Sequence, residues 1–314
     1  MPSPLPIPRL WKSVVATCSI IARAGAGART LAGCVALATA TVGPSHAAPP
    51  EFELFAMDNG VGRGSWTPAR QAATLREVGF TGISYNYTNP ADLKVWLAEL
   101  QAAGRAFRGL YFTTRLDRPQ AFPEGIEEAV AALRGSGAVL WLTVQGPARP
   151  GERDAEAIRR IQAAADLAAS AGLRVSLYPH QGFYLTTAEQ ALELTLRSGR
   201  ANVGVTVNLT HELAAGNGAR LPEIIRLVAP CLTMVTINGA TDRPDLGGSN
   251  RIKLLGEGDY DVGAIVRTLA EVKYHGPIGV QFYSIKGDPD ANLRATMSAW
   301  RKMTGSATPI NQAP

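Results

Sequence analysis

The chain has 314 residues, of which 46% are hydrophobic and 18% are charged, a composition typical of a globular protein with one large core. The formal net charge of +5 comes mostly from residues 1–47, which hold four of the 31 basic residues and no acidic residue, leaving 27 basic and 26 acidic residues beyond them. This near balance leaves no basic stripe for binding nucleic acid, so we expect no nucleic-acid partner.

Residues 1–47 have the pattern of a secretory signal peptide. Basic residues precede an apolar run at 31–42, and Ser45-His46-Ala47 has the small-x-small pattern that signal peptidase recognises. The run is too short to span a bilayer. A lipobox-like segment ends at Cys34, but its apolar run follows the cysteine, which does not favour lipidation. We therefore expect a periplasmic or secreted protein that begins near Ala48 and has no stable membrane anchor.

From residue 52 onward, short apolar runs alternate with longer amphipathic segments, which predicts βαβ units around a parallel sheet. Eight runs are apolar nearly throughout, as is typical of strands covered on both faces: 52–57, 82–85, 108–112, 139–144, 174–178, 203–207, 233–237 and 278–282. Their even spacing, and the lack of a GxGxxG motif after the first, favour closure into an α/β fold of the (β/α)₈ TIM-barrel type over an open sheet. We expect one domain over 48–304 and a disordered polar tail over 305–314.

Several of the expected helices carry start and stop signals. Thr67 precedes Pro68 and can cap a helix whose first position tolerates proline. Thr186 and Glu189 have the spacing of a capping box. Gly172 and Gly199 follow the helical segments that precede the fifth and sixth strands, and glycine is the residue most common just past a helix end.

The active site of a closed barrel lies at the carboxyl ends of the strands. The strand exits of this chain are rich in amides, tyrosines and histidines. Such groups bind sugar hydroxyls by paired hydrogen bonds, and aromatic faces cover the apolar side of a sugar ring. We therefore predict a small-molecule carbohydrate ligand, bound by Asp58, Tyr85, Gln145, Tyr178, Asn208, His211, Asn238 and Gln281. Asp58 followed by Asn59-Gly60 is equally consistent with a tight turn, and His211 with the start of a helix.

Two other motifs do not favour additional chemistry. The segment Gly256-Glu257-Gly258-Asp259 is glycine-rich but lacks the lysine and hydroxyl residue of a phosphate-binding loop, and Asp261 at the following helix start would repel phosphate. Cys231 is the sole cysteine after the predicted leader and lies at the start of an apolar strand, so we expect it to be structural rather than nucleophilic.

Five segments follow one another in a characteristic order and spacing: 66–68 with 75–80, 175–180, 203–211, 255–261 and 274–281. Together they resemble the xylose isomerase-like TIM barrel family, which includes sugar phosphate isomerases and epimerases. Members of that family typically bind one divalent metal through a Glu, an Asp, a His and a second Glu at different strand ends.

The resemblance places neutral residues at all four metal-ligand positions, namely Tyr178, Asn208, Thr236 and Gln281. Divalent cations such as Mg²⁺ and Mn²⁺ prefer carboxylate ligands. We therefore interpret the chain as a divergent member of this family and predict that it uses neither a metal nor another cofactor.

The leading functional hypothesis is a sugar isomerase/epimerase-like barrel that moves a proton next to a carbonyl group of a sugar or keto-sugar. This chemistry needs an acid/base group and a group that stabilises the enediolate oxygen. We predict His180 as the acid/base, because imidazole titrates near neutral pH, and Glu257 as a reserve base. Tyr178, Asn208, Asn238 and Gln281 would stabilise the oxygen as neutral donors or acceptors in place of the metal.

Two alternatives stay open at this point. One is a carbohydrate-binding barrel without catalytic activity. The other is a lyase or hydrolase of glycosides or keto-glycosides. A hydrolase usually needs two opposed carboxylates, and only Asp58, Glu212, Asp242 and Glu257 could supply them. The sequence does not indicate the sugar or the oligomeric state.

Overall fold

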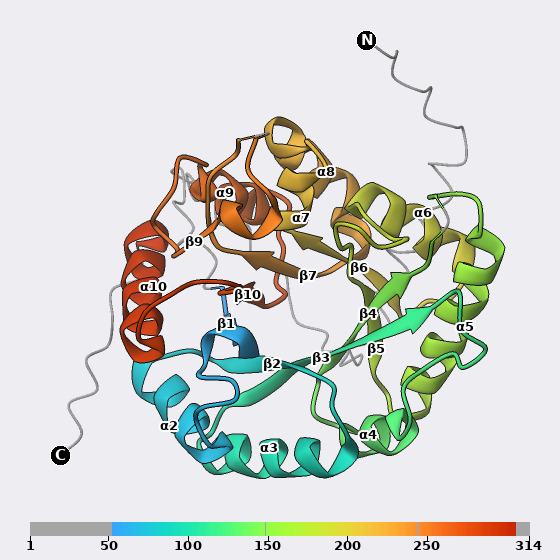
Figure 1. Cartoon of the computed structure of the whole chain (residues 1–314), viewed down its shortest axis with the longest axis horizontal. Coiled ribbons are helices and arrows are strands. Elements are labelled where there is room, and N and C mark those ends of the chain that lie inside the picture. Colours follow the sequence, from blue (N-terminus) through green and yellow to red (C-terminus); the bar gives the residue numbers. More distant parts are fainter. Residues whose placement is uncertain (1–51, 148, 244, 306–314) are drawn as a thin grey trace, which may run out of the picture. The chain divides into compact units, whose positions relative to one another are not determined.

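The structure, a computed structural model, describes residues 52–147, 149–243 and 245–305, so the predicted leader and the tail from residue 306 lie outside it. Eight parallel strands in this part of the chain form a closed barrel in the order β1-β10-β7-β6-β5-β4-β3-β2 (Figure 1). The expected (β/α)₈ barrel is therefore confirmed. The strands are β1 (Leu54–Met57), β2 (Gly82–Asn86), β3 (Ala106–Arg115), β4 (Val139–Gln145), β5 (Arg174–Leu177), β6 (Val203–Asn208), β7 (Leu232–Ile237) and β10 (Ile278–Val280).

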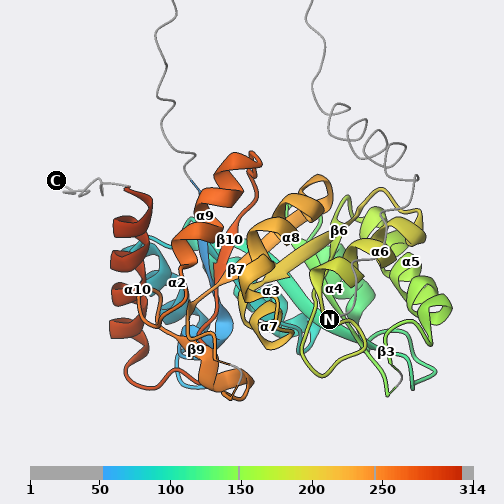
Figure 2. The same ribbon diagram turned by 90° about the horizontal axis from the view of Figure 1, so that it is seen from above.

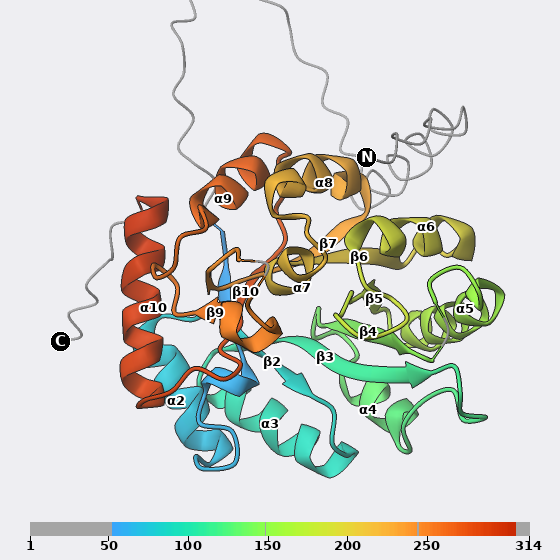
Figure 3. The same ribbon diagram turned by 45° about the horizontal axis from the view of Figure 1, so that its top comes forward.

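Helices surround the barrel on its outer side (Figures 1 and 3). The last of them, α10, runs along the side of the barrel in Figure 2 and is tied to α2 by a hydrogen bond of 3.2 Å from the Arg301 guanidinium to the Val78 carbonyl. No helix of the described residues is long and apolar enough to cross a membrane. The helices are α2 (Pro68–Val78), α3 (Pro90–Ala102), α4 (Ile126–Ala132), α5 (Asp154–Ser170), α6 (Ala188–Ser198), α7 (Leu209–Ala214), α8 (Leu221–Val228), α9 (Val262–Glu271) and α10 (Pro289–Thr304).

Side-chain caps fix where several of these helices begin. The Thr67 hydroxyl accepts a hydrogen bond from the Arg70 amide at 3.3 Å, and Pro68 occupies the first turn of α2, as expected. The capping box of α6 was predicted one residue too early. The N-cap is Thr187, because its hydroxyl accepts from the Gln190 amide at 3.2 Å. Gln190 rather than Glu189 reaches back, and its side-chain oxygen accepts from the Thr186 amide at 2.9 Å.

A two-stranded antiparallel sheet between β7 and α9 was not predicted. It pairs β8 (Gly239–Ala240) with β9 (Ile252–Lys253), and these strands are too short to leave an alternating pattern in the sequence. Gly239 is required by close backbone approach, since a Cβ atom there would lie 1.8 Å from the Leu254 carbonyl oxygen.

The inside of the barrel is filled mainly by large side chains. Phe55, Trp141, Tyr178 and Met234 belong to one buried cluster on the inner faces of four strands. Space for this cluster comes from a glycine on the neighbouring strand β10, since a Cβ atom on Gly279, which pairs with Phe55, would lie 2.5 Å from the Phe55 ring. The packed interior leaves the carboxyl ends of the strands as the place for a site.

Candidate functional site

An amide-centred cluster joins the carboxyl ends of four neighbouring strands. The Asn208 side-chain nitrogen, at the end of β6, lies 2.6 Å from the Tyr178 hydroxyl, 2.6 Å from the Thr236 hydroxyl and 3.1 Å from the Gln281 side-chain oxygen. Tyr178 follows β5, Thr236 belongs to β7, and Gln281 follows β10, so residues far apart in the sequence meet at one point. All four side chains are buried. The positions that the resemblance assigns to metal ligands are thus brought together.

The orientation of the Asn208 amide is fixed by the helix that follows it. Its side-chain oxygen accepts a hydrogen bond of 3.1 Å from the His211 backbone amide and so caps α7. The nitrogen must then face the barrel axis, where three oxygens surround its two hydrogens. Because both hydrogens bond within the protein, Asn208 has no donor left for a ligand.

The two phenols near this cluster stay uncharged. Tyr178 packs edge-on against Trp141 and Tyr111, with ring centroids 5.1 and 5.3 Å away. Burial raises the pKa of Tyr178 far above its ordinary value and raises the pKa of Tyr111 to about 12. Neither phenol therefore supplies a negative charge at neutral pH.

The residues at the implied metal position do not fit a divalent cation. Tyr178, Asn208, Thr236 and Gln281 offer neutral oxygens, and the Asn208 nitrogen points at the centre where a cation would need acceptors. Within the described residues, no group of three or more His, Cys, Asp or Glu side chains is arranged to hold a metal ion.

Two histidines meet beside the cluster. The His180 ring, in the loop after β5, lies 4.0 Å from the His211 ring of α7, measured between centroids. The Phe183 ring stacks on the His180 ring, also with centroids 4.0 Å apart. The backbone of Gln181 contacts both rings: its amide is 3.3 Å from His211 Nδ1, and its carbonyl oxygen is 2.8 Å from His180 Nδ1. Burial lowers the pKa of both histidines, and the charge of protonated His180 lowers the pKa of His211 further. Both rings are therefore neutral at neutral pH.

Asp58 and its neighbour Asn59 hold the strand exits together. One Asp58 oxygen accepts from the Arg63 guanidinium at 2.9 Å, and the other accepts from the Asn86 amide at the end of β2 at 3.1 Å. The Asn59 side-chain oxygen accepts from the Phe282 amide beyond β10 at 3.0 Å. Burial raises the pKa of Asp58, although the Arg63 charge opposes the shift. Through these bonds Asp58 and Asn59 hold the backbone of the strand exits in place, which agrees with the structural reading, a tight turn, that the sequence left open.

Asn238 is also occupied by the protein. Its side-chain oxygen accepts from the Thr210 hydroxyl at 2.8 Å, and its nitrogen donates to the Gly239 carbonyl at 2.7 Å. The side chain is buried, and these two bonds fix its orientation.

Tyr85 lies on the outer face of its strand. Met57 of β1 belongs to the interior cluster and pairs with Ser84 of β2, so Ser84 faces the interior. Successive side chains of a strand point to opposite faces, so Tyr85 faces the helices. The Tyr85 ring accordingly packs on Trp96 of α3 with centroids 4.9 Å apart. The structure therefore does not bring Tyr85 to the other predicted site residues.

Gln145 ends β4 with the same parity as Trp141, which places it on the inner face. Its side-chain oxygen accepts from the Arg115 guanidinium of β3 at 2.9 Å, and the residue is half-buried. Gln145 thus lies at the rim of the barrel on the β3–β4 side, bonded to an exposed arginine.

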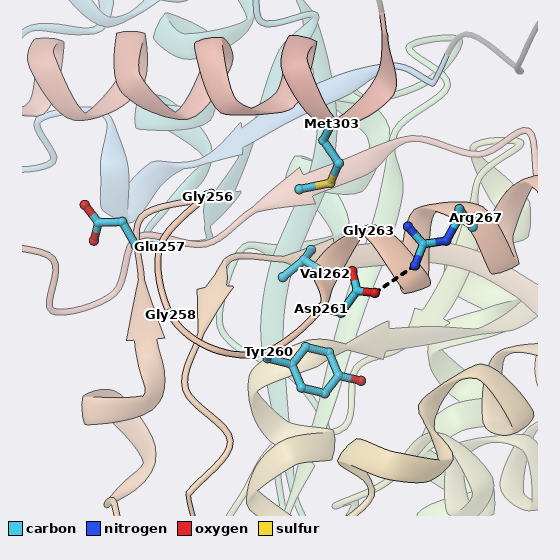
Figure 4. Close-up of a pocket in the computed structure, with 9 residues that line it drawn as sticks. All are labelled: Gly256, Glu257, Gly258, Tyr260, Asp261, Val262, Gly263, Arg267 and Met303. Carbon is cyan, nitrogen blue, oxygen red and sulfur yellow. Dashed lines mark hydrogen bonds and ion pairs between the residues drawn. The ribbon is translucent and has the colours of Figure 1, made fainter.

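Glu257 lies in the loop that precedes α9, next to a surface cavity of about 360 Å³ (Figure 4). Its exposed side chain points away from the other residues drawn there and makes no hydrogen bond or ion pair with any described residue. The Asp261 carboxylate caps α9 by accepting from the Ala264 amide at 3.0 Å and pairs with Arg267 at 2.7 Å. This carboxylate occupies the helix start, so the loop is not suited to phosphate.

Several inner-face residues near the cluster were not predicted. Tyr111 packs on Tyr178, and the Thr113 and Thr143 hydroxyls are 2.8 Å apart on neighbouring strands. The buried Trp141 Nε1 has no hydrogen-bond partner within the described residues. The alternation along 106–115 was the available signal, because Tyr111 and Thr113 share the inner parity while Leu110 and Phe112 face the helices.

Solved structures with the same fold are similar to this chain at low sequence identity. A xylose isomerase-like TIM barrel/4-hydroxyphenylpyruvate dioxygenase fusion protein superimposes with a TM-score of 0.65 and 14% identity, over 81% of this chain, which spans 43% of that longer protein. The 3-keto-D-glucoside 4-epimerase of E. coli gives a TM-score of 0.65 and 13% identity over 80% of this chain and all of that one. The D-allulose 3-epimerase of Methylomonas sp. in complex with D-allulose gives 0.64 and 18% over 82% and 99%.

The family itself is shown by the sequence. No curated protein sequence matches the chain. The sequence model of one protein family, however, matches residues 70–303, which span the barrel from α2 to α10. The chain belongs to the xylose isomerase-like TIM barrel family.

Proposed function

We propose that this barrel acts on a sugar or keto-sugar and moves a proton at the carbon next to a carbonyl group, without a metal. The observation that carries the proposal is the hydrogen bond of 2.8 Å between His180 Nδ1 and the Gln181 carbonyl. A carbonyl only accepts, so Nδ1 carries the proton and the neutral ring has a free lone pair on Nε2. The epimerases with the same fold, which act on a 3-keto-D-glucoside and on D-allulose according to their names, support a carbohydrate substrate.

His180 has the properties of a general base. The ring is half-buried, Phe183 stacks on it and the His211 ring lies against it, so its orientation is set before a substrate binds. The lowered pKa keeps Nε2 unprotonated at neutral pH, ready to accept a proton.

Gln281 is suited to hold a sugar hydroxyl. Its side-chain oxygen accepts from Asn208, which turns its amide nitrogen away from the cluster, and that nitrogen has no acceptor among the described residues. A donor of this kind pairs with a substrate oxygen. Substitution by glutamate, which has acceptors only, should therefore weaken ligand binding.

The hydrolase alternative is not favoured by the carboxylates. Asp58 is bonded to Arg63 and to a backbone amide, and Asp242 pairs with Arg251 at 3.3 Å. The buried Glu212 accepts from the Ala188 amide and from the Asn217 side chain, both at 2.7 Å. These three carboxylates hold loops and helix starts in place. Of the four carboxylates that the sequence offered, only Glu257 has no partner among the described residues, so the four do not supply an opposed free pair.

The test compares His180→Gln with wild type on a panel of ketoses and keto-glycosides that includes D-allulose and D-fructose. Glutamine keeps a hydrogen-bonding group of similar reach but does not shuttle a proton, so we expect turnover to fall about 10²–10⁴-fold while the sugar affinity changes little. His275→Gln, an exposed histidine outside the site, is the matched control. Full activity of His180→Gln would contradict the proposal. Sugar binding by the wild type without turnover would instead support a carbohydrate-binding barrel.

Export is a separate part of the proposal and rests on residues 1–47 alone. The basic start, the apolar run and the cleavage-site pattern are typical of a secreted protein. In a host with a matching secretion system, N-terminal sequencing of the exported protein should begin near Ala48. An intact leader on a cytoplasmic product would contradict export.

A further inference from the structure

The backbone of Gln181 gives the two site histidines opposite tautomers. Its carbonyl accepts from His180 Nδ1 at 2.8 Å, which leaves His180 Nε2 as an acceptor. Its amide donates to His211 Nδ1 at 3.3 Å, so that nitrogen holds a lone pair and the proton of the neutral His211 ring lies on Nε2. One residue therefore prepares one ring to accept a proton and the neighbouring ring to donate a hydrogen bond.

His211 is held in this form by its surroundings. The ring lies against His180, with centroids 4.0 Å apart, and edge-on to Tyr178 at 5.9 Å. The His211 backbone amide is fixed in turn by Asn208, which caps α7. The buried ring is 7% exposed, and its Nε2 proton has no acceptor among the described residues. That proton is therefore free to bond to a molecule at the barrel mouth, water or a substrate.

We propose that His211 is the neutral hydrogen-bond donor that stabilises the enediolate oxygen, in the place of the family's metal. This inference rests on the proposed function and assigns a second catalytic residue to it. His180 Nε2 takes the proton from the carbon next to the carbonyl, and the C–H electron pair forms the new C=C bond. The carbonyl π electrons move to the oxygen, which accepts a hydrogen bond from His211 Nε2. The proton of the adjacent hydroxyl group moves to this oxygen, and that hydroxyl becomes the new carbonyl. The C=C electron pair then takes the proton back from His180 at the former carbonyl carbon, which restores the base.

A neutral imidazole is suited to this task because its N–H is held in place before the charge develops. Triosephosphate isomerase is a known case of a neutral histidine polarising a carbonyl in the same way. The two rings are in contact, so the two Nε2 atoms can reach a carbonyl oxygen and the carbon beside it in one molecule.

The pairing also narrows the reaction. Inversion at one carbon needs a second acid on the opposite face of the substrate, and the other titratable groups at the described strand ends are unsuited to it. Asp58 is bonded to Arg63 and to the Asn86 amide. Tyr178 is a buried phenol, and the pKa of the half-buried Tyr111 phenol is raised to about 12. Removal and return of a proton by the same His180 favours transfer between adjacent carbons. We therefore infer an open-chain α-hydroxy carbonyl sugar as the substrate class, with aldose–ketose isomerisation as the reaction.

The experiment measures the tautomers and the donor directly. In the full chain labelled with ¹⁵N-histidine, long-range ¹H–¹⁵N spectra should show the proton on Nδ1 of His180 and on Nε2 of His211. The signals are assigned by single His→Gln variants, with His275 as the internal control. Glycolohydroxamate, a small mimic of an enediolate, should shift both Nε2 signals and leave those of His275 unchanged. The opposite tautomer of His211, or no response to the hydroxamate, would overturn the proposal.

Two variants test whether the donor matters. His211→Gln places an amide donor near the position of Nε2 and should keep glycolohydroxamate affinity within a few-fold. His211→Phe keeps a ring but has no donor, so its glycolohydroxamate affinity should fall about ten- to a hundredfold, as expected for the loss of a hydrogen bond to a charged acceptor. Equal affinities in the two variants would overturn the proposal. Hydroxamate binding with the expected tautomers would support the donor even if no sugar were turned over, so this inference and the proposed function fail separately.

Discussion

Replacement of Asn208 by alanine should destabilise the barrel more than the loss of a helix cap alone. The change removes the cap of α7, which is worth about 1 kcal/mol. It also removes the two hydrogens that the amide shares among Tyr178, Thr236 and Gln281, at about 1 kcal/mol for each buried hydrogen bond. The expected total is about 3 kcal/mol. For a barrel of this size, that loss corresponds to a decrease in melting temperature of roughly 6–12 °C.

Asn89→Ala is the matched control, because Asn89 caps α3 in the same way but is exposed and bonds only near the helix start. Its cost should be about 1 kcal/mol. Urea unfolding followed by tryptophan fluorescence and by circular dichroism gives both free energies on one scale. The reasoning is refuted if Asn208→Ala costs no more than Asn89→Ala, since the cluster would then add nothing to the cap.

Three further predictions concern pH, packing and metal. Burial lowers the pKa of His180 and His211 below 6.5, so the unfolded chain binds more protons than the folded chain as the pH falls. The free energy of unfolding should therefore be at its full value above about pH 6.5 and should decrease at lower pH. The decrease should be smaller in His211→Gln. Urea titrations between pH 7.5 and 5.5 measure this slope, and a steeper slope in the variant would contradict it. Gly279→Ala should lower the free energy of unfolding by about 1–3 kcal/mol, because its Cβ would lie 2.5 Å from the Phe55 ring. Phe55→Leu should recover part of this loss in the double variant, and additive losses there would rule out the clash. Dialysis against a chelator should leave the melting temperature and any turnover unchanged, and elemental analysis should find substoichiometric Mn, Co and Zn; stoichiometric metal on His180 and His211 would overturn the metal-free chemistry.

The fold could be predicted because its signals are local. Runs such as 203–207 and 139–144 are apolar nearly throughout, and this pattern appears when helices cover both faces of a strand. The start of α6 shows where such signals fail. Thr186 and Thr187 are adjacent and both able to cap, and the choice is set by Gln190, which also donates to the Tyr184 carbonyl.

The site was predictable where position in the chain fixes position in space. Tyr178, Asn208 and Gln281 follow or end β5, β6 and β10 at the same end of the barrel, so their meeting follows from topology. Tyr85 shows the limit, because one step along a strand exchanges the inner face for the outer one. The tautomers of His180 and His211 depend on how the Gln181 backbone turns between them, and no pattern of residue types encodes that turn.

The seam between the first and last strands has a consequence for how the chain folds. The bond from the Phe282 amide to Asn59 joins positions 223 residues apart, and β1 pairs with β10 along the same seam. Until β10 has been synthesised, both β1 and β7 are edge strands with unpaired backbone groups. Closure must therefore wait for nearly the whole chain, and such long-range pairing is slow. A nascent or truncated chain that ends before residue 278 lacks β10, so it presents two open edges to chaperones, proteases or other copies of itself.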